Sequence, residues 1–139
     1  MHSTMKNPTE IVNMMLNNDA FSKWLGVAVL QLEKGSCELR MQTTDIMLNG
    51  FDILHGGVSY SLADSALAFA SNSYGNKCVS IETSISHIRP VKKGDILTAK
   101  AIEIHRGKTT GIYEVLITNQ ENKKVAFFKG VVYISKEIW

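Results

Sequence analysis

The fold of this chain is decided by residues 56–74, which read GGVSYSLADSALAFASNSY. We interpret this stretch as one long helix, for which Gly75 is a typical C-terminal stop. Apolar residues occupy nearly every side of the helix: Val58, Leu62, Ala63, Ala66, Leu67, Phe69 and Ala70. A helix that is apolar all round is usually a buried helix, so we expect the rest of the chain to cover it.

Strand-like segments lie on both sides of this helix in the sequence. In one of them Tyr113, Val115 and Ile117 alternate with Glu114 and Thr118, which is the period of a strand with one buried face. Turn residues separate the segments. The six predicted strands are 27–32, 37–43, 77–88, 96–104, 111–119 and 125–134.

Two short helices are predicted before the first strand. Asn7-Pro8-Thr9-Glu10 is typical of a helix start with a capping box. Asp19 can open a second short helix, which Gly26 closes. The simplest arrangement of all these elements is an α+β fold, in which a curved antiparallel sheet wraps around one long central helix. At 139 residues, we expect one domain, 1–139.

Composition excludes several classes of protein. The hydrophobic share is 45% and the charged share 20%, which is an ordinary globular balance. The net charge of +2 provides no strong basic field for nucleic acid. The N-terminal residues lack the apolar run of a secretory signal, and the longest stretch nearly free of charge contains Asp64 and five serines. We therefore expect neither nucleic-acid binding nor a membrane span, and a cytoplasmic location.

The cysteines and histidines do not form a metal-binding pattern. Cys37 and Cys78 are far apart and form no CxxC pair, so we expect two free thiols in a reducing compartment. His2, His87 and His105 have no metal-like spacing to His55 or to one another. The sequence therefore predicts no metal site. It also has no P-loop and no dinucleotide fingerprint, so we expect no bound cofactor.

Asp64 is out of place in the predicted helix. It is the only formally charged side chain between Asp52 and Lys77. Burying an unpaired carboxylate costs several kcal/mol or raises its pKa. Two interpretations remain open: a desolvated carboxylate that serves as base or nucleophile, or a structural one satisfied by serine or tyrosine hydroxyls or by a distant arginine.

A second candidate feature precedes the helix. Asn49-Gly50 and then His55-Gly56-Gly57 lead into its first turn, where free backbone N–H groups carry the positive end of the helix dipole. Such groups can stabilise an oxyanion. The alternative is an ordinary loop-to-helix turn. For His55 we favour a hydrogen bond that fixes the loop over a role as general base or ligand.

Basic residues gather in the connectors between strands. They are either an ordinary solvated surface or the mouth of a site for a phosphorylated ligand. The candidates are Arg89, Lys92, Arg106 and Lys108.

These motifs together resemble the hotdog-fold acyl-CoA thioesterases, and especially the phenylacetate-degradation (PaaI-like) family. The resemblance rests on Asn49-Gly50, on His55-Gly56-Gly57 and on Leu62-Ala63-Asp64, whose aspartate follows Gly57 by seven residues. Further on, Arg89-Pro90 and Gly94-Asp95 also look like this family. The similarity extends over roughly residues 18–133.

The resemblance implies a role for each matching residue. Asp64 would attack the thioester or activate water, Gly56 N–H would bind the thioester carbonyl, and Asn49 would shape the site. His55 matches the motif histidine, and Ser80 matches a residue that places substrate or water. The resemblance also implies an acyl-CoA substrate of the aryl or arylacetyl type, and dimers joined sheet edge to sheet edge that pair into tetramers. Further residues expected to contact substrate are Gly57, Tyr60 and Leu67.

Helix geometry predicts that the active site is shared between two chains. Asp64 is eight residues after Gly56, which is roughly 12 Å along a helix axis. One carbonyl carbon cannot lie about 3 Å from both groups. A second, antiparallel copy of the helix solves this, and small residues at Ser61, Ser65 and Ala68 would let the two helices approach.

Two other functions have to be weighed against hydrolysis. A hydroxyacyl-thioester dehydratase could pair His55 with Asp64, although the Pro-rich element expected after its histidine is absent. A non-catalytic acyl-CoA-binding module would not need a buried Asp64, and it would usually carry a fused partner domain.

Overall fold

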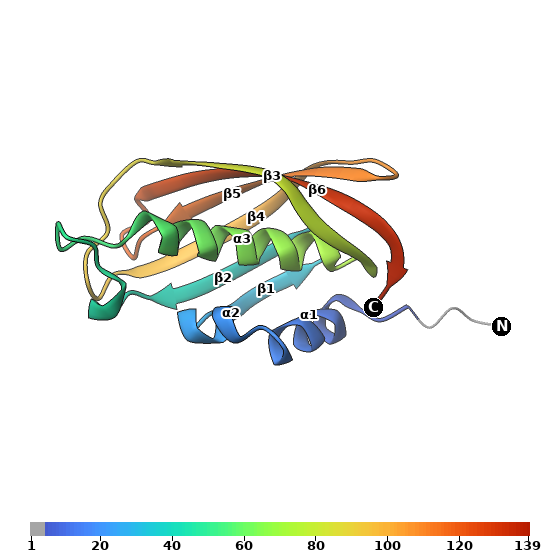
Figure 1. Ribbon diagram of the computed structural model, residues 1–139, viewed down its shortest axis with the longest axis horizontal. Coiled ribbons are helices and arrows are strands. Elements are labelled where there is room, and N and C mark those ends of the chain that lie inside the picture. Colours follow the sequence, from blue (N-terminus) through green and yellow to red (C-terminus); the bar gives the residue numbers. More distant parts are fainter. Residues whose placement is uncertain (1–4) are drawn as a thin grey trace.

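The computed structural model describes residues 5–139, which pack around one long central helix, α3 (Gly56–Asn72). A six-stranded antiparallel sheet curves around this helix, while two short helices, α1 and α2, lie along the opposite side of the molecule (Figure 1). The strand order is β1-β2-β4-β5-β6-β3. The strands are β1 (Ala28–Glu33), β2 (Ser36–Gln42), β3 (Asn76–His87), β4 (Ile96–Arg106), β5 (Thr110–Thr118) and β6 (Lys124–Ile138). This confirms the predicted fold.

The inward face of the sheet is a continuous apolar surface. Leu39, Ala99, Ile117 and Ala126 lie opposite one another across four strands, and each is at most 1% exposed. Alternate residues along β5 are buried, as its period of two predicts. The apolar residues of α3 fill the space inside this curve, so burial of one helix holds the whole sheet in shape.

Helix α3 lies close against the sheet at Gly130 of β6. A Cβ atom added there would lie 2.5 Å from Leu67 Cδ2 of α3, so the position has no room for a side chain. Leu67 is itself 1% exposed. The missing side chain in the strand therefore makes room for a large one on the helix.

The two N-terminal helices are capped as the sequence predicts. In α1 (Pro8–Asn17), Asn7 and Glu10 form the reciprocal capping box. In α2 (Ala20–Leu25), Asp19 caps the start, and Gly26 ends the helix at φ 74°. A buried hydrogen bond of 2.8 Å between the Ser22 and Ser65 hydroxyls then ties α2 to α3.

The structure corrects three details of the predicted fold. The central helix is not covered on every side, because Gly57, Ser61, Asp64 and Ala68 form a stripe at helical spacing that stays partly or fully exposed. Ser65 was expected on this open face, but it is buried against α2. The last strand also continues beyond its expected end at residue 134.

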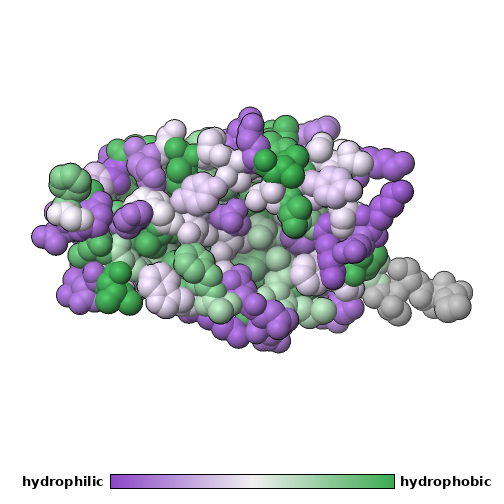
Figure 2. Space-filling view, viewed as in Figure 1, coloured by the Kyte–Doolittle hydropathy of each residue, from purple (hydrophilic) through white to green (hydrophobic). Residues whose placement is uncertain are grey.

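The extension of β6 to Ile138 follows from its pairing with β3. Asn76 lies opposite Ile138, so the beginning of β3 keeps the end of β6 extended. Within residues 5–139, no strand pairs with the other edge of β3. This strand carries the exposed side chains of Val79 (64%) and Ile81 (59%). Strongly hydrophobic side chains gather on this face where β3 crosses it (Figure 2). Among residues 5–139, no helix is long and apolar enough to cross a membrane.

Candidate active site

The candidate residues are divided between two pockets, both lined in part by α3. The first, which we call the donor pocket, has a volume of about 350 Å³ and contains Asn49, Gly56 and Arg89. The second, the carboxylate pocket, has a volume of about 240 Å³ and contains Asp64, Leu67 and Ser80. No residue lines both pockets. The structure of one chain thus keeps the proposed oxyanion donors apart from the carboxylate.

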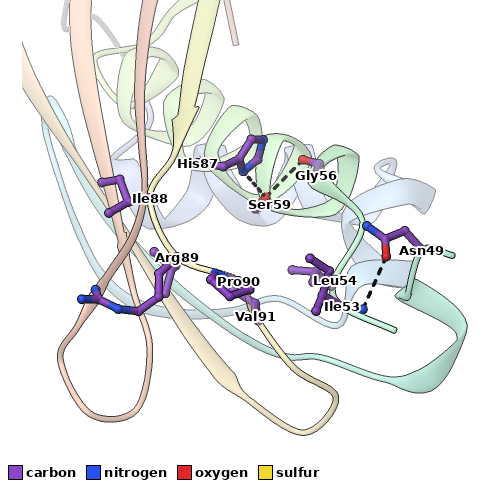
Figure 3. Close-up of a pocket in the computed structure, with 11 residues that line it drawn as sticks. Asn49, Ile53, Leu54, Gly56, Ser59, His87, Ile88, Arg89, Pro90 and Val91 are labelled. Atoms are coloured by element: carbon purple, nitrogen blue, oxygen red, sulfur yellow. Dashed lines mark hydrogen bonds between the residues drawn. The ribbon is translucent and has the colours of Figure 1, made fainter. Parts of the chain in front are cut away.

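Asn49 organises the loop at the entrance of the donor pocket. Its Oδ1 accepts hydrogen bonds from the N–H groups of Phe51 (2.8 Å) and Ile53 (3.4 Å), and its own N–H donates to the Ile53 carbonyl (2.8 Å). The side-chain amide Nδ2 makes no hydrogen bond within residues 5–139. Asn49 therefore holds the loop with one side-chain atom and keeps a free donor on the other (Figure 3).

The first turn of α3 presents one free backbone donor. His55 is the N-cap residue, and its Nδ1 accepts the Gly57 N–H at 2.9 Å. The Gly56 N–H has no hydrogen-bond partner within the described part of the chain. His55 thus fixes the loop-to-helix turn, and the amide of Gly56 stays available at the positive end of the helix.

Two residues that the sequence analysis did not select also line the donor pocket, Ser59 and His87. The His87 ring packs over Gly56, where an added Cβ would lie 3.0 Å from Nε2. Ser59 Oγ lies 3.1 Å from the Gly56 carbonyl oxygen and 3.5 Å from His87 Nδ1 (Figure 3). Nothing local in the sequence brings His87 here, because it stands at the end of β3, 31 positions after Gly56.

Asp64 is half-buried, and its carboxylate has no partner in the described part of the chain. Among residues 5–139 no side chain donates a hydrogen bond to its carboxylate, and the one ion pair is Lys123–Glu121. The hydroxyls considered as structural partners are used elsewhere: Tyr60 bonds to Thr83, Ser61 to the Gly57 carbonyl, and Ser65 to Ser22. Burial raises the pKa of Asp64. Among the described residues of one chain, no hydroxyl or arginine satisfies this carboxylate, so the interpretation of Asp64 as a purely structural residue has no support.

The other predicted substrate contacts are distributed unevenly. Leu67 and Ser80 line the carboxylate pocket, together with Cys78 and Val132. Tyr60 lies against Phe128 with its ring edge-on, and it lines neither pocket. Burial raises the pKa of the Cys78 thiol, as expected for a cysteine that packs as a small hydrophobic residue.

The basic candidates have different surroundings. Arg89 lines the donor pocket, but its guanidinium donates to the Lys124 carbonyl (2.7 Å) and points away from Gly56 (Figure 3). The side chains of Lys92 and Lys108 are exposed. The Arg106 guanidinium forms hydrogen bonds within the protein.

Arg106 belongs to a polar network at the C-terminal end of α3. It donates to the Ser71 carbonyl and to Tyr113 Oη, both at 3.1 Å, and its guanidinium stacks 3.9 Å from the centre of the Tyr74 ring. Both tyrosines also donate to the carboxylate of Glu103. These contacts place the guanidinium against the fold instead of leaving it free for a ligand.

The fold and the two pockets define a class of protein, the hotdog-fold thioesterases. The thioesterase superfamily matches residues 51–126, which include the Gly56 turn, Asp64 and His87. The chain belongs to this superfamily. This confirms the predicted class of enzyme, a thioester hydrolase.

Individual relatives are similar over most of their length. "Acyl-coenzyme A thioesterase PaaI" of Escherichia coli (strain K12) is 44% identical over 116 residues, which cover 84% of this chain and 83% of the relative. The structure of the E. coli PaaI protein from the phenylacetic acid degradation operon superposes with a TM-score of 0.93 at 38% identity, over 98% of this chain and 99% of that one. The smu.793 protein of Streptococcus mutans UA159, bound to acetyl CoA, has a TM-score of 0.79 at 27% identity, over 81% of this chain and 91% of its own.

Proposed function

We propose that this chain is a cytoplasmic acyl-CoA thioesterase that acts on aryl- or arylacetyl-CoA and works as one hotdog unit. The observation that carries the proposal is the pair of unsatisfied groups on α3, the Gly56 N–H and the Asp64 carboxylate. Support for the substrate class comes from the similarity to a relative named acyl-coenzyme A thioesterase PaaI and to a structure that holds acetyl CoA. The two free cysteines fit a reducing compartment.

In the proposed reaction the thioester carbonyl oxygen accepts the Gly56 N–H while it gains negative charge. Asp64 acts by one of two routes. In the first it adds to the carbonyl carbon, the C–S bond breaks, CoA leaves as thiolate, and water then hydrolyses the acyl-aspartate anhydride. In the second it takes a proton from a water molecule whose oxygen adds to the carbon, and the same thiolate leaves. In both routes Asn49 holds the entrance loop and Ser80 positions the substrate or the water.

Because the two groups lie in separate pockets, the proposed site is completed by a second copy of the chain. A two-fold axis beside α3 would place Asp64 of one chain near Gly56 of the other, with the contact repeated symmetrically. The open stripe of Gly57, Ser61, Asp64 and Ala68 has only short side chains, so a second helix can approach it. The unpaired edge of β3, with its exposed Val79 and Ile81, offers a strand that can extend the sheet into the partner.

The remaining contacts follow from this arrangement. Leu67, in the carboxylate pocket, would contact the acyl group, and Tyr60 and Gly57 would line the route between the chains. Arg89, Lys92 and Lys108 would meet the nucleotide phosphates of CoA at the exposed mouth. Arg106 is better suited to hold the end of α3. Dimers of this kind would pair into tetramers.

Complementation between two inactive variants tests the shared site. Asn49→Ala and Asp64→Asn should each hydrolyse acyl-CoA weakly. When they are co-expressed, random pairing makes half of the dimers mixed, and each mixed dimer contains one intact site of two, so roughly a quarter of wild-type activity should return. A preparation shown to contain mixed dimers but no recovered activity would rule out the shared site.

Release of free thiol from a panel of acyl-CoAs tests the reaction itself. We expect hydrolysis to be fastest with aryl or arylacetyl thioesters. Binding without thiol release would instead support an acyl-CoA-binding module, and loss of water from a hydroxyacyl thioester would support a dehydratase.

A further inference from the structure

We propose that His87 is a second hydrogen-bond donor to the thioester carbonyl, acting from Nε2 beside the Gly56 N–H, and that Ser59 is the positioning residue that directs its proton. This inference rests on the proposed function and adds a catalytic residue to the same site. The observation behind it is the imidazole that packs over Gly56 in the donor pocket (Figure 3).

His87 lies where its side chain can donate a hydrogen bond to the thioester carbonyl oxygen. Its Nε2 would lie 3.0 Å from a Cβ atom at residue 56, so it faces the same glycine whose N–H is free. An oxygen that accepts the Gly56 N–H therefore enters next to the imidazole. His55 does not offer this contact, because its Nδ1 is used by the Gly57 N–H at the helix cap.

A neutral histidine carries one ring proton, and the partner of one nitrogen decides which nitrogen holds it. The Ser59 hydroxyl lies between two acceptors, the Gly56 carbonyl at 3.1 Å and His87 Nδ1 at 3.5 Å. When it donates to Nδ1, the proton of the ring is on Nε2 and points toward the substrate. When it donates to the carbonyl instead, Nδ1–H donates to Ser59 and Nε2 presents a lone pair.

The developing oxyanion selects the first of these two arrangements. A lone pair on Nε2 would repel a negatively charged oxygen, whereas an N–H attracts it more strongly as the charge grows. Ser59 is 4% exposed, so its hydroxyl is shielded from competing water. In the productive arrangement the Ser59 hydroxyl therefore donates to Nδ1, and the ring proton is already on Nε2 before the carbonyl oxygen gains charge.

The test compares His87→Phe with His87→Gln. Phenylalanine keeps a ring over Gly56 and removes both nitrogens, while the glutamine amide supplies a donor near the former Nε2. Loss of one oxyanion donor lowers kcat by about 10²- to 10³-fold in a well-studied protease. We expect His87→Phe to lower kcat by about 10²-fold with little change in KM, and His87→Gln to retain most of the activity.

The Ser59→Ala variant tests whether Ser59 directs the ring proton of His87 or only supports the structure. In the wild-type background we expect this variant to lower kcat, because Nδ1 loses its donor. In the His87→Gln background the same substitution should have little further effect, since a glutamine amide needs no partner to hold its proton. A structural role for Ser59 would lower kcat equally in both backgrounds.

Two CoA analogues give a readout that does not depend on turnover. A methylene ketone keeps the carbonyl but cannot be cleaved at sulfur, and a thioether lacks the carbonyl altogether. His87→Phe should weaken binding of the ketone and leave binding of the thioether unchanged. Circular dichroism and thermal unfolding of each variant establish that the fold is retained.

The outcomes distinguish this inference from the proposed function. If the wild-type protein hydrolyses acyl-CoA and a folded His87→Phe variant is fully active, only the role of His87 is overturned. The same holds if His87→Phe and His87→Gln lower kcat equally. Absence of thiol release by the wild-type protein would overturn the proposed function and this inference with it.

Discussion

The donor pocket and the carboxylate pocket are both lined by α3, but hydrogen bonds within residues 5–139 fix the loop and first turn of the donor pocket and not the Asp64 carboxylate of the other. Around Gly56, the side chains of Asn49 and His55 accept local N–H hydrogen bonds that set the loop and the first turn, and the Gly56 N–H has no partner among the described residues. Asp64, about two turns further along, has no hydrogen-bond partner among the described residues. One half is thus organised by its own chain, whereas the other is left for a ligand or a second chain to complete.

Replacing the unpartnered carboxylate should produce the largest effect. Asp64→Asn keeps the shape of the side chain and removes its anionic form, so we expect acyl-CoA hydrolysis to fall at least about a hundredfold, the scale of a positioned base or nucleophile. The rate of free-thiol release measures this loss. The fold should be as stable as the wild type or more so, because a partly buried charge is removed. A variant with near wild-type activity would show that the carboxylate pocket takes no part in the chemistry.

Removing charge near the donor pocket should affect binding more than chemistry. Neutralising Arg89, Lys92 and Lys108 together should raise KM for acyl-CoA several-fold, since exposed ionic contacts contribute roughly 0.2–1 kcal/mol each. The rise should be larger at low salt, and kcat with a short pantetheine thioester should barely change.

Arg106→Gln is the matched control for that triple variant. Because Arg106 is tied to Ser71 and Tyr113, its loss should lower the melting temperature instead of raising KM selectively for CoA substrates. Equal losses of activity on CoA and pantetheine thioesters in the triple variant would indicate that Arg89, Lys92 and Lys108 are structural as well.

The helix cap in the donor pocket should make a smaller, measurable contribution to stability. His55→Ala removes the acceptor for the Gly57 N–H, and loss of an N-cap typically costs about 1 kcal/mol of the free energy of unfolding. Denaturant unfolding measures this cost. His55→Asn restores a good capping residue and should recover most of it. If the alanine variant is fully stable but inactive, His55 acts in the chemistry and not as a cap.

The smallest expected effect is that of the Asp64 carboxylate on the pH dependence of the free energy of unfolding. Burial raises the pKa of Asp64 in the folded chain above its value in the unfolded chain. Its stabilising contribution is therefore complete below the unfolded pKa, near 3.8, and is lost as pH rises through the folded pKa. We expect wild type to lose stability relative to Asp64→Asn over this range, as measured by denaturant unfolding at several pH values. A constant difference would mean that the carboxylate is solvated like that of an exposed aspartate.

Most of the fold could be predicted from the sequence because its signals are local. The caps at Asn7 and Asp19 and the alternation in β5 each depend on neighbouring residues alone. The same holds for Asp64, whose charge stands out within its own helix, and for the glycines before it. The proposal of two half-sites also rests on a local quantity, the rise per residue of a helix. The predicted stop at Gly75 was wrong, because α3 ends at Asn72 with Ser73 as its C-cap.

Tertiary structure alone decided which distant groups meet. His87 reaches Gly56 because β3 runs along the edge of the sheet and ends beside the start of α3. Arg106 was predicted to lie in a connector with a free charge, but it is the last residue of β4 and donates to Tyr113 and Ser71. Such contacts depend on strand order and on the curvature of the sheet, which arise from the packing of the whole core. No spacing within the sequence encodes them, whereas the capping residues and the periodic apolar positions act through the backbone next to them.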